Sequence, residues 1–251
     1  MAKVTGITQR LFVNQYDLSG DVGALDTAQH ARNQQDVTVL TDAALERLGL
    51  LRDGHMSFTA FFDTDPGQEH PVLKGLPQSA LFTWLMGITL GSPTCSLVAN
   101  TTDYPITRGA DGSLVLKPTA DANGFGLQWG NLLTAGIQTF ASAAATTGVD
   151  DYVPSFPTLA LPSTWGLAAY LHVISLGSGT AVVHLQDSTD NLSFSDLTGG
   201  AFTNVTGATS QRIQTSPTQA INRYLRVNVS GTFTNLVAVV SAIRYVNQFV
   251  S

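Results

Sequence analysis

The feature that most constrains this chain is the alternation of apolar and polar residues over short runs, each ended by Gly, Asn, Asp or Pro. In "HMSFTAFFD" (55–63), Met56, Phe58 and Ala60 alternate with polar residues until Phe61 breaks the pattern. A period of two places successive side chains on opposite faces, which is typical of half-buried strands. Because such runs recur along the chain, we expect a mainly β fold.

Two segments near the N-terminus depart from this alternation. Residues 19–40 are polar with little periodicity, and they predict a long loop; loops of that length in a compact domain are commonly functional. The following segment, "TDAALERLGLLRDG" (41–54), predicts a short helix whose N-cap is Thr41 or Asp42.

A change in composition over residues 137–163 predicts a domain boundary. This region is rich in Ala and Thr and then in Pro, and the expected linker spans 149–163. It would separate a β domain at 1–148 from an antiparallel, jelly-roll-like β-sandwich at 164–251. Short turns such as "GSG" and "STDN" divide the strands expected in this sandwich: 166–176, 180–188, 201–206, 211–215, 223–231 and 236–246.

Charge limits the possible partners. Only 12% of the residues are charged, whereas about 25% is typical of soluble domains, so we expect other subunits to cover much of the surface. The net charge is −6 and there is no basic run, which argues against specific DNA binding through phosphate contacts. An acidic protein can nevertheless surround DNA without gripping it, because like charges keep the two apart.

Several other features are informative by their absence. The single cysteine, Cys95, excludes an internal disulfide and argues against a cysteine-based zinc site. No run approaches the roughly 18 apolar residues that a membrane-spanning helix needs. "MAKVTGITQR" contains no hydrophobic stretch, so we expect no secretory signal and synthesis in a reducing cytoplasm.

The stretch "LRDGHMSFTAFFDTDPGQEH" (51–70) concentrates the residues that metal or acid/base chemistry would use. A strand rises about 3.3 Å per residue, so His55 and Asp63 would lie roughly 26 Å apart and cannot share a ligand. "DTDPG" is also ordinary turn composition, which favours a solvated strand end over a site. Four residues remain close enough in sequence to cluster: Asp63, Asp65, Glu69 and His70.

The remaining chemical signals are weak. "QDSTDN" (186–191) offers Asp187 and Asp190 to calcium but lacks the EF-hand spacing, and a hairpin turn explains it better. His172 and His184 alternate with apolar neighbours on expected adjacent strands, which favours structural roles. There is no phosphate-binding loop, HExxH or CxxC. We therefore predict no catalytic, metal-binding or cofactor-binding residue, no cofactor, and a protein that is not an enzyme.

Aromatic residues in the C-terminal half raise an alternative function. Jelly rolls often bind sugars through exposed aromatic side chains, although packing in the core is the commoner role. The candidates for such a sugar-binding platform are Trp165, Tyr170, Phe194 and Phe202.

The order of segments resembles a known family. "LFVNQYDLSGDVGALDT", "GLLRDGHMSFTAFFD" and "YPITRGADGSLVLKPTADANGFGLQWGNLLTAG" are similar to the major tail (tail tube) proteins of long-tailed bacteriophages and prophages. The C-terminal segment from "AYLHVISLGSGTAVVHLQDS" to "RYLRVNVSGTFTNLVAVVSAIRY" looks like the β-sandwich that accompanies them. The resemblance covers most of the chain outside the linker.

The resemblance implies a structural protein of the virion tail, assembled in the bacterial cytoplasm. Such subunits form rings, commonly sixfold, that stack through terminal arms and a long loop into a tube through which DNA passes. Its implied partners are copies of itself and other tail proteins, such as terminator, tape measure and distal tail proteins. The resemblance implies a tail-tube-like fold at 1–148, and acidic residues that line the lumen or the contacts between rings: Asp17, Asp21, Asp26 and Asp36.

Two competing functions remain open. One is a virion decoration or carbohydrate-binding adhesion module acting through the C-terminal jelly roll. The other is a glycan hydrolase, which needs two carboxylates about 5–9 Å apart in a cleft. The sequence offers no strong pair of this kind.

Overall fold

A computed structural model describes residues 7–41, 43–151 and 163–245. The chain forms two compact units. Unit 1 comprises residues 1–19, 83–96 and 129–251, and unit 2 comprises residues 20–82 and 97–128. The fold is mainly β and antiparallel, as the sequence predicts.

The strands come in two long pairs with many short partners. The long strands are β3 (Val22–Asp36), β4 (Arg47–Phe61), β14 (Leu167–Ser188) and β17 (Tyr224–Arg244). The N-terminal half also contains β1 (Arg10–Val13), β2 (Tyr16–Asp17), α1 (Glu69–Leu73), β5 (Ala80–Leu85), β6 (Pro93–Asp103), β7 (Ile106–Arg108), β8 (Leu114–Leu116) and β9 (Thr119–Ala122). The remaining strands are β10 (Gln128–Leu132), β11 (Gln138–Phe140), β12 (Ala144–Ala145), β13 (Val149–Asp150), β15 (Ser195–Ala201) and β16 (Thr209–Gln214).

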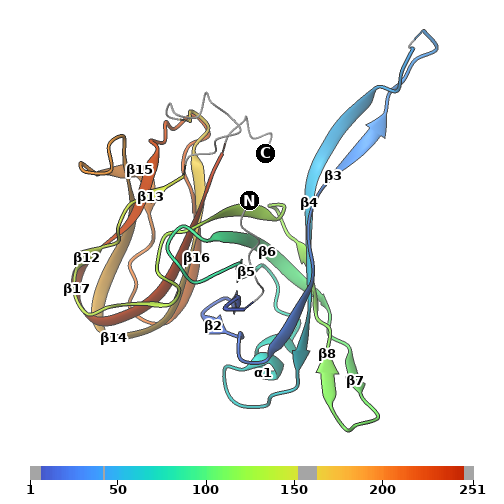
Figure 1. Ribbon diagram of the computed structural model, residues 1–251, viewed down its shortest axis with the longest axis horizontal. Coiled ribbons are helices and arrows are strands. Elements are labelled where there is room, and N and C mark those ends of the chain that lie inside the picture. The colour runs from blue at the N-terminus through green and yellow to red at the C-terminus, as the bar shows by residue number, and fades with distance from the viewer. Residues whose placement is uncertain (1–6, 42, 152–162, 246–251) are drawn as a thin grey trace. The chain divides into compact units, whose positions relative to one another are not determined.

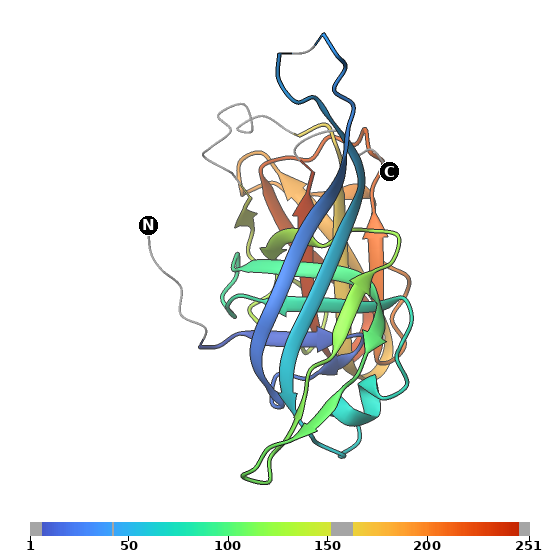
Figure 2. The ribbon, with the colours of Figure 1, turned by 90° about the vertical axis from the view of Figure 1, so that its right-hand side faces the viewer.

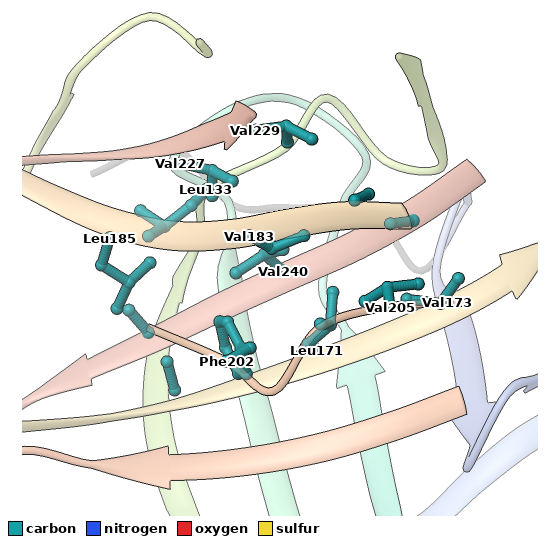
Figure 3. Close-up of a cluster of buried hydrophobic side chains, with 14 of the residues drawn as sticks. Leu133, Leu171, Val173, Val183, Leu185, Phe202, Val205, Val227, Val229 and Val240 are labelled. Carbon is teal, nitrogen blue, oxygen red and sulfur yellow. The ribbon is translucent and has the colours of Figure 1, made fainter. Parts of the chain in front are cut away.

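Unit 1 is built on β14 and β17, which pair from Leu167↔Arg244 to Ser188↔Tyr224. β14 is buried at both ends and largely exposed in its middle, residues 175–180. Side chains from both ends of the strand pair enter one buried cluster, which Figure 3 shows. The strand pair therefore bends in the middle, and its two halves form the two layers of a β-sandwich.

Short strands extend each layer of this sandwich. β16 pairs with the first half of β14, and β10 and β11 pair with the second half of β17. In the other layer β15 pairs with the end of β14, and β12 and β13 pair with the start of β17. The short strands thus cover edges of the central pair that would otherwise be open to pairing with another chain.

Two glycines allow the bend. Gly179 and Gly231 have φ values of +86° and +103°, a region that side chains rarely adopt. A Cβ atom on Gly179 would lie 2.1 Å from the Thr232 carbonyl oxygen, and one on Gly231 would lie 2.4 Å from that of Thr180. At this point the two backbones approach more closely than any side chain permits.

Unit 2 is built on a long β-hairpin of β3 and β4 (Figures 1 and 2). At its base, β4 also pairs with β8 at Ala60 and Phe61 and with β9 at residues 55–57. Met56, Phe58 and Ala60 point from β4 into the core of the unit and are buried. The helix α1 lies at the base of the hairpin, at the end of the unit opposite the hairpin tip.

Local predictions were less accurate than the fold class. The helix predicted at 41–54 is wrong, because residues from Arg47 belong to β4; the short helix of this fold is α1. The loop predicted at 19–40 is mostly strand β3. The "GSG" turn is a bend inside β14 rather than a break between two strands, and residues 223–231 and 236–246 likewise fall within a single strand up to Arg244.

The grouping into units also differs from the two domains expected from the sequence. Residues 131–150 contribute strands that pair with β17, so they belong with the C-terminal strands. Most of the predicted linker (152–162) and the start of the predicted N-terminal arm (1–6) lie outside the described residues. Among the described residues, no helix is long and apolar enough to span a membrane.

The bend in unit 1 yields the first prediction. We expect Gly231→Ala to lower the free energy of unfolding by about 2–4 kcal/mol, because a left-handed backbone is strained for alanine and its methyl group would collide with Thr180. Gly207→Ala is the matched control, since a Cβ there meets nothing within 4 Å. Urea unfolding of both variants measures the difference, and equal stabilities would contradict the bend as described.

Candidate functional site

The outer half of the β3–β4 hairpin is the largest feature that the core of unit 2 does not explain. On β4, burial alternates from Gly54 onward, whereas residues 47–51 are all exposed. β3 is exposed or half-buried throughout, and it pairs with β4 from Val22 to Asp36. The hairpin thus leaves the core as a two-stranded ribbon with both faces open.

Apolar side chains gather on this ribbon and its tip. Leu40 is fully exposed, Leu51 is 78% exposed and Leu45 is 64% exposed. The apolar tip consists of Val37, Val39, Leu40, Leu45, Leu48, Leu50 and Leu51. Exposed apolar groups at this density mark an interaction surface, and a two-stranded ribbon is only marginally stable in water by itself.

The base of the hairpin carries an acidic cluster of Asp21, Asp63, Asp65 and Glu69. The Glu69 amide donates a hydrogen bond to Asp21 Oδ2 (3.1 Å), which joins α1 to the start of β3. The side chain of Glu69 is fully buried, and neither carboxylate oxygen has a hydrogen bond of ordinary geometry. A buried carboxyl beside other acids is therefore the unusual group of this cluster.

The electrostatics of the cluster follow from burial and like charge. Burial, and then the Asp21 charge, raise the pKa of Glu69 to about 7, although the nearby Tyr104 hydroxyl offsets part of the shift. Burial also raises the pKa of Asp21, an effect that the Glu69 amide opposes and that Asp63 and Asp65 reinforce. In the described residues, no group of three or more His, Cys, Asp or Glu side chains is arranged to hold a metal ion.

The structure separates the two ends of the 51–70 stretch, as the strand geometry predicts. His55 Nδ1 lies within hydrogen-bonding distance of Asp121 Oδ1 on β9 (2.8 Å). At the other end, His70 Nδ1 lies 3.0 Å from the Tyr104 hydroxyl, beside the acidic cluster. Sequence reasoning missed Asp21 as a neighbour of Glu69, because the two are 48 positions apart and only the return of the hairpin brings them together.

A buried polar chain crosses unit 1. His172 on β14 is fully buried; its Nδ1 donates to the Asn14 carbonyl (2.5 Å), so its Nε2 accepts from the Thr83 hydroxyl (2.8 Å). Thr83 in turn lies 3.0 Å from the Ser96 hydroxyl. Burial lowers the pKa of His172 to about 4. The neutral imidazole therefore ties β14 to the turn after β1 and to β5, which is the structural role predicted for it.

The four acids proposed for the lumen or ring contacts do not form one group. Asp17 pairs with Arg10 (2.7 Å) in unit 1, whereas Asp21 belongs to the acidic cluster of unit 2. Asp26 accepts a hydrogen bond from Thr59 across the hairpin, and Asp36, near the tip, accepts one from Thr38. Three of the four thus lie along the hairpin, and their role in assembly stays a prediction.

The aromatic residues of the proposed sugar platform are only partly accessible. Tyr170 and Phe202 are buried, so they cannot stack on a sugar in this structure. Trp165 is half-buried, and Phe194 is half-buried beneath the Arg226 guanidinium, 4.0 Å from the ring centroid. The platform as predicted is therefore wrong for two of its four members, because core packing claims them.

Comparisons with known proteins give distant similarities only. No family model and no curated protein matches the chain. The chain is similar to the SPP1 Dit (gp 19.1) protein, described as a paradigm of the hub adsorption apparatus in phages infecting Gram-positive bacteria, at 7% identity and a TM-score of 0.35 over 94% of this chain and 100% of that one. It is also similar to a chain of the phage p2 baseplate in its activated conformation with Sr, at 9% identity and a TM-score of 0.34 over 96% and 100%. Likenesses this weak carry no conclusion about fold or function.

The burial of Glu69 predicts a pH-dependent stability. The pKa of Glu69 is higher in the folded protein than in the unfolded chain. Glu69 therefore lowers the free energy of unfolding increasingly as pH rises from about 4.5 to about 7, and by a constant amount above that. We expect Glu69→Gln to raise the free energy of unfolding by about 2–3 kcal/mol at pH 8 and to change it little at pH 4.5. Urea unfolding at both pH values measures this, and Glu46→Gln, at an exposed glutamate, is the control.

His172 predicts the opposite pH dependence. Because its pKa is lower when folded, protonation of the unfolded chain removes stability as pH falls from about 6.5 to about 4. We expect this loss to be about 3 kcal/mol and to be absent in His172→Gln. Unfolding curves between pH 4 and 7 test this, with His184→Gln as the control. The test is the difference between the two curves, because Glu69 acts in the opposite direction over much of this range. The same pH dependence in the wild type and in His172→Gln would mean that His172 is not buried and neutral.

Proposed function

We propose that this chain is a structural, non-enzymatic subunit of a bacteriophage tail that assembles with copies of itself into rings, which stack into the tail tube. The observation that carries the proposal is the β3–β4 ribbon, which exposes seven large apolar side chains beyond the core of unit 2. An isolated subunit gains nothing from such a surface.

The energetics favour a partner that covers the ribbon. Each Å² of apolar surface removed from water contributes roughly 25 cal/mol, so burying a few leucines supplies several kcal/mol. The edge of β3 that faces away from β4 also offers backbone donors and acceptors to a neighbouring strand. A heterologous contact of this type closes into a ring when its rotation permits, and repeated stacking of rings builds a tube.

The assignment to a phage tail rests on the resemblance of the sequence to tail tube proteins, and the charge of the chain agrees with it. A net charge of −6 without a basic run suits a wall past which DNA slides. The partners of this function are copies of the chain and, at the ends of the tube, the terminator, tape measure and distal tail proteins.

Imaging tests the proposal. We expect purified full-length chain to form rings or tubes in negative stain and to sediment as assemblies. Leu40→Ser combined with Leu51→Ser should weaken assembly by tenfold or more, since both side chains are exposed in the subunit and would become buried.

The matched control is Leu192→Ser, at a leucine that is 85% exposed in unit 1. It should leave assembly unchanged. Monodisperse monomers of the wild-type chain at every concentration tested would refute the proposed function.

A further inference from the structure

The core-facing side of the β3–β4 ribbon becomes cationic where it leaves the core. His30 pairs with Gly54 and Arg32 pairs directly with Arg52, which places the three basic side chains on one face. We call this group, His30, Arg32 and Arg52, the cationic face. His30 and Arg32 are exposed and Arg52 is half-buried, so the face is accessible in the subunit.

The two arginines of the cationic face, Arg32 and Arg52, repel each other. Like charges directly opposite in a strand pair are destabilising. Burial, Arg52 and Arg32 together lower the pKa of His30, as expected if the arginine charges are felt at the imidazole. No ion pair neutralises Arg32 within the described part of the chain. An acidic partner would relieve this repulsion.

The acidic cluster at the base of the hairpin has the opposite charge, and its members also repel one another. Asp63 is half-buried and Asp65 is exposed, so both can meet a partner. Both interact electrostatically with Asp21, which accepts the hydrogen bond from the amide of the buried Glu69. The four acids lie close enough to disfavour one another's charge. A cation placed beside them would stabilise the ionised forms.

The two charged groups cannot meet within one copy of the chain. Asp21 immediately precedes β3, and Arg32 lies eleven residues farther along the hairpin. At about 3.3 Å per residue the two are roughly 35 Å apart. Figures 1 and 2 likewise show α1, which carries Glu69, at the end of unit 2 opposite the hairpin tip.

We propose that the cationic face of one copy docks on the acidic cluster of a second copy, head to tail, and so sets the register of the assembly. This inference rests on the proposed function and names the contact that the proposed function leaves open. The contact joins different surfaces of identical subunits, so it repeats from copy to copy. Its charged groups add specificity to the affinity that the apolar tip supplies.

Charge reversal tests the contact. We expect Arg32→Glu/Arg52→Glu and, separately, Asp63→Lys/Asp65→Lys to weaken assembly of the full chain at least tenfold at low salt, measured by sedimentation velocity. An equimolar mixture of the two variants should assemble again, because each then offers the charge that the other needs. Arg108→Glu/Lys117→Glu, at exposed residues of unit 2, changes net charge equally and should leave assembly intact.

The outcomes separate the two proposals. If the wild-type chain assembles but charge reversal has no effect, or the mixture stays dissociated, the docking contact is wrong and the proposed function stands. If the wild-type chain does not assemble, both fail. If the arginine variant assembles normally but loses affinity for a DNA duplex that the wild type binds, the cationic face serves nucleic acid and the docking contact is overturned.

Discussion

The pairing of β14 with β17 is the interaction on which the order of unit 1 depends. Because both halves of this strand pair bury side chains in one cluster, the sandwich exists only when the pair is bent and complete. The same pair explains why residues 131–150 belong to this unit, since their short strands cover the remaining edge of β17. Long-range pairing of this kind leaves little freedom for the halves to form separately.

In unit 2, by contrast, the strand pair β3–β4 extends beyond the core that it helps to form. The last close contacts between β4 and the core lie at residues 52–54. A Cβ atom on Gly54 would lie 2.3 Å from the Leu127 backbone nitrogen, and one on Gly126 would lie 3.1 Å from the Arg52 Cβ atom. Beyond this point, both faces of the ribbon are open. The contacts of the single subunit lie at the base of the hairpin, and we propose that a partner covers the rest.

The sequence predicted the fold class because a half-buried strand alternates apolar and polar residues however the strands are arranged. It did not predict the hairpin, since a ribbon that no core covers has no reason to alternate, and residues 22–36 therefore read as a loop. For the same reason, the segment that contains the leucines of residues 45–51 was predicted to be a helix. The glycines of "GSG" suggested a turn, whereas Gly179 permits the close backbone approach of a bend.

The candidate site was predictable in its parts but not in its assembly. Glu69, Asp63 and Asp65 are close in sequence, and their possible clustering could be read from the sequence. Asp21 joins them only because the hairpin returns the chain to its starting point, as the bond from the Glu69 amide to Asp21 shows. The burial of Tyr170 could not be predicted either. Residues 167–173 of β14 are buried on both faces, so this part of the strand has no alternation that distinguishes buried from exposed positions.

The arrangement of charges along the hairpin favours one mode of association over others. A contact between two ribbons that aligns their cationic faces would place Arg32 and Arg52 of one copy near those of the other, and the repulsion already present in each subunit would increase. A displacement by about the length of the hairpin instead brings each self-repelling group against its opposite. The apolar tip, which has no such preference, supplies affinity in either arrangement. The charges therefore favour an arrangement in which opposite groups meet, and such a contact, when it is made head to tail as we propose, repeats from copy to copy.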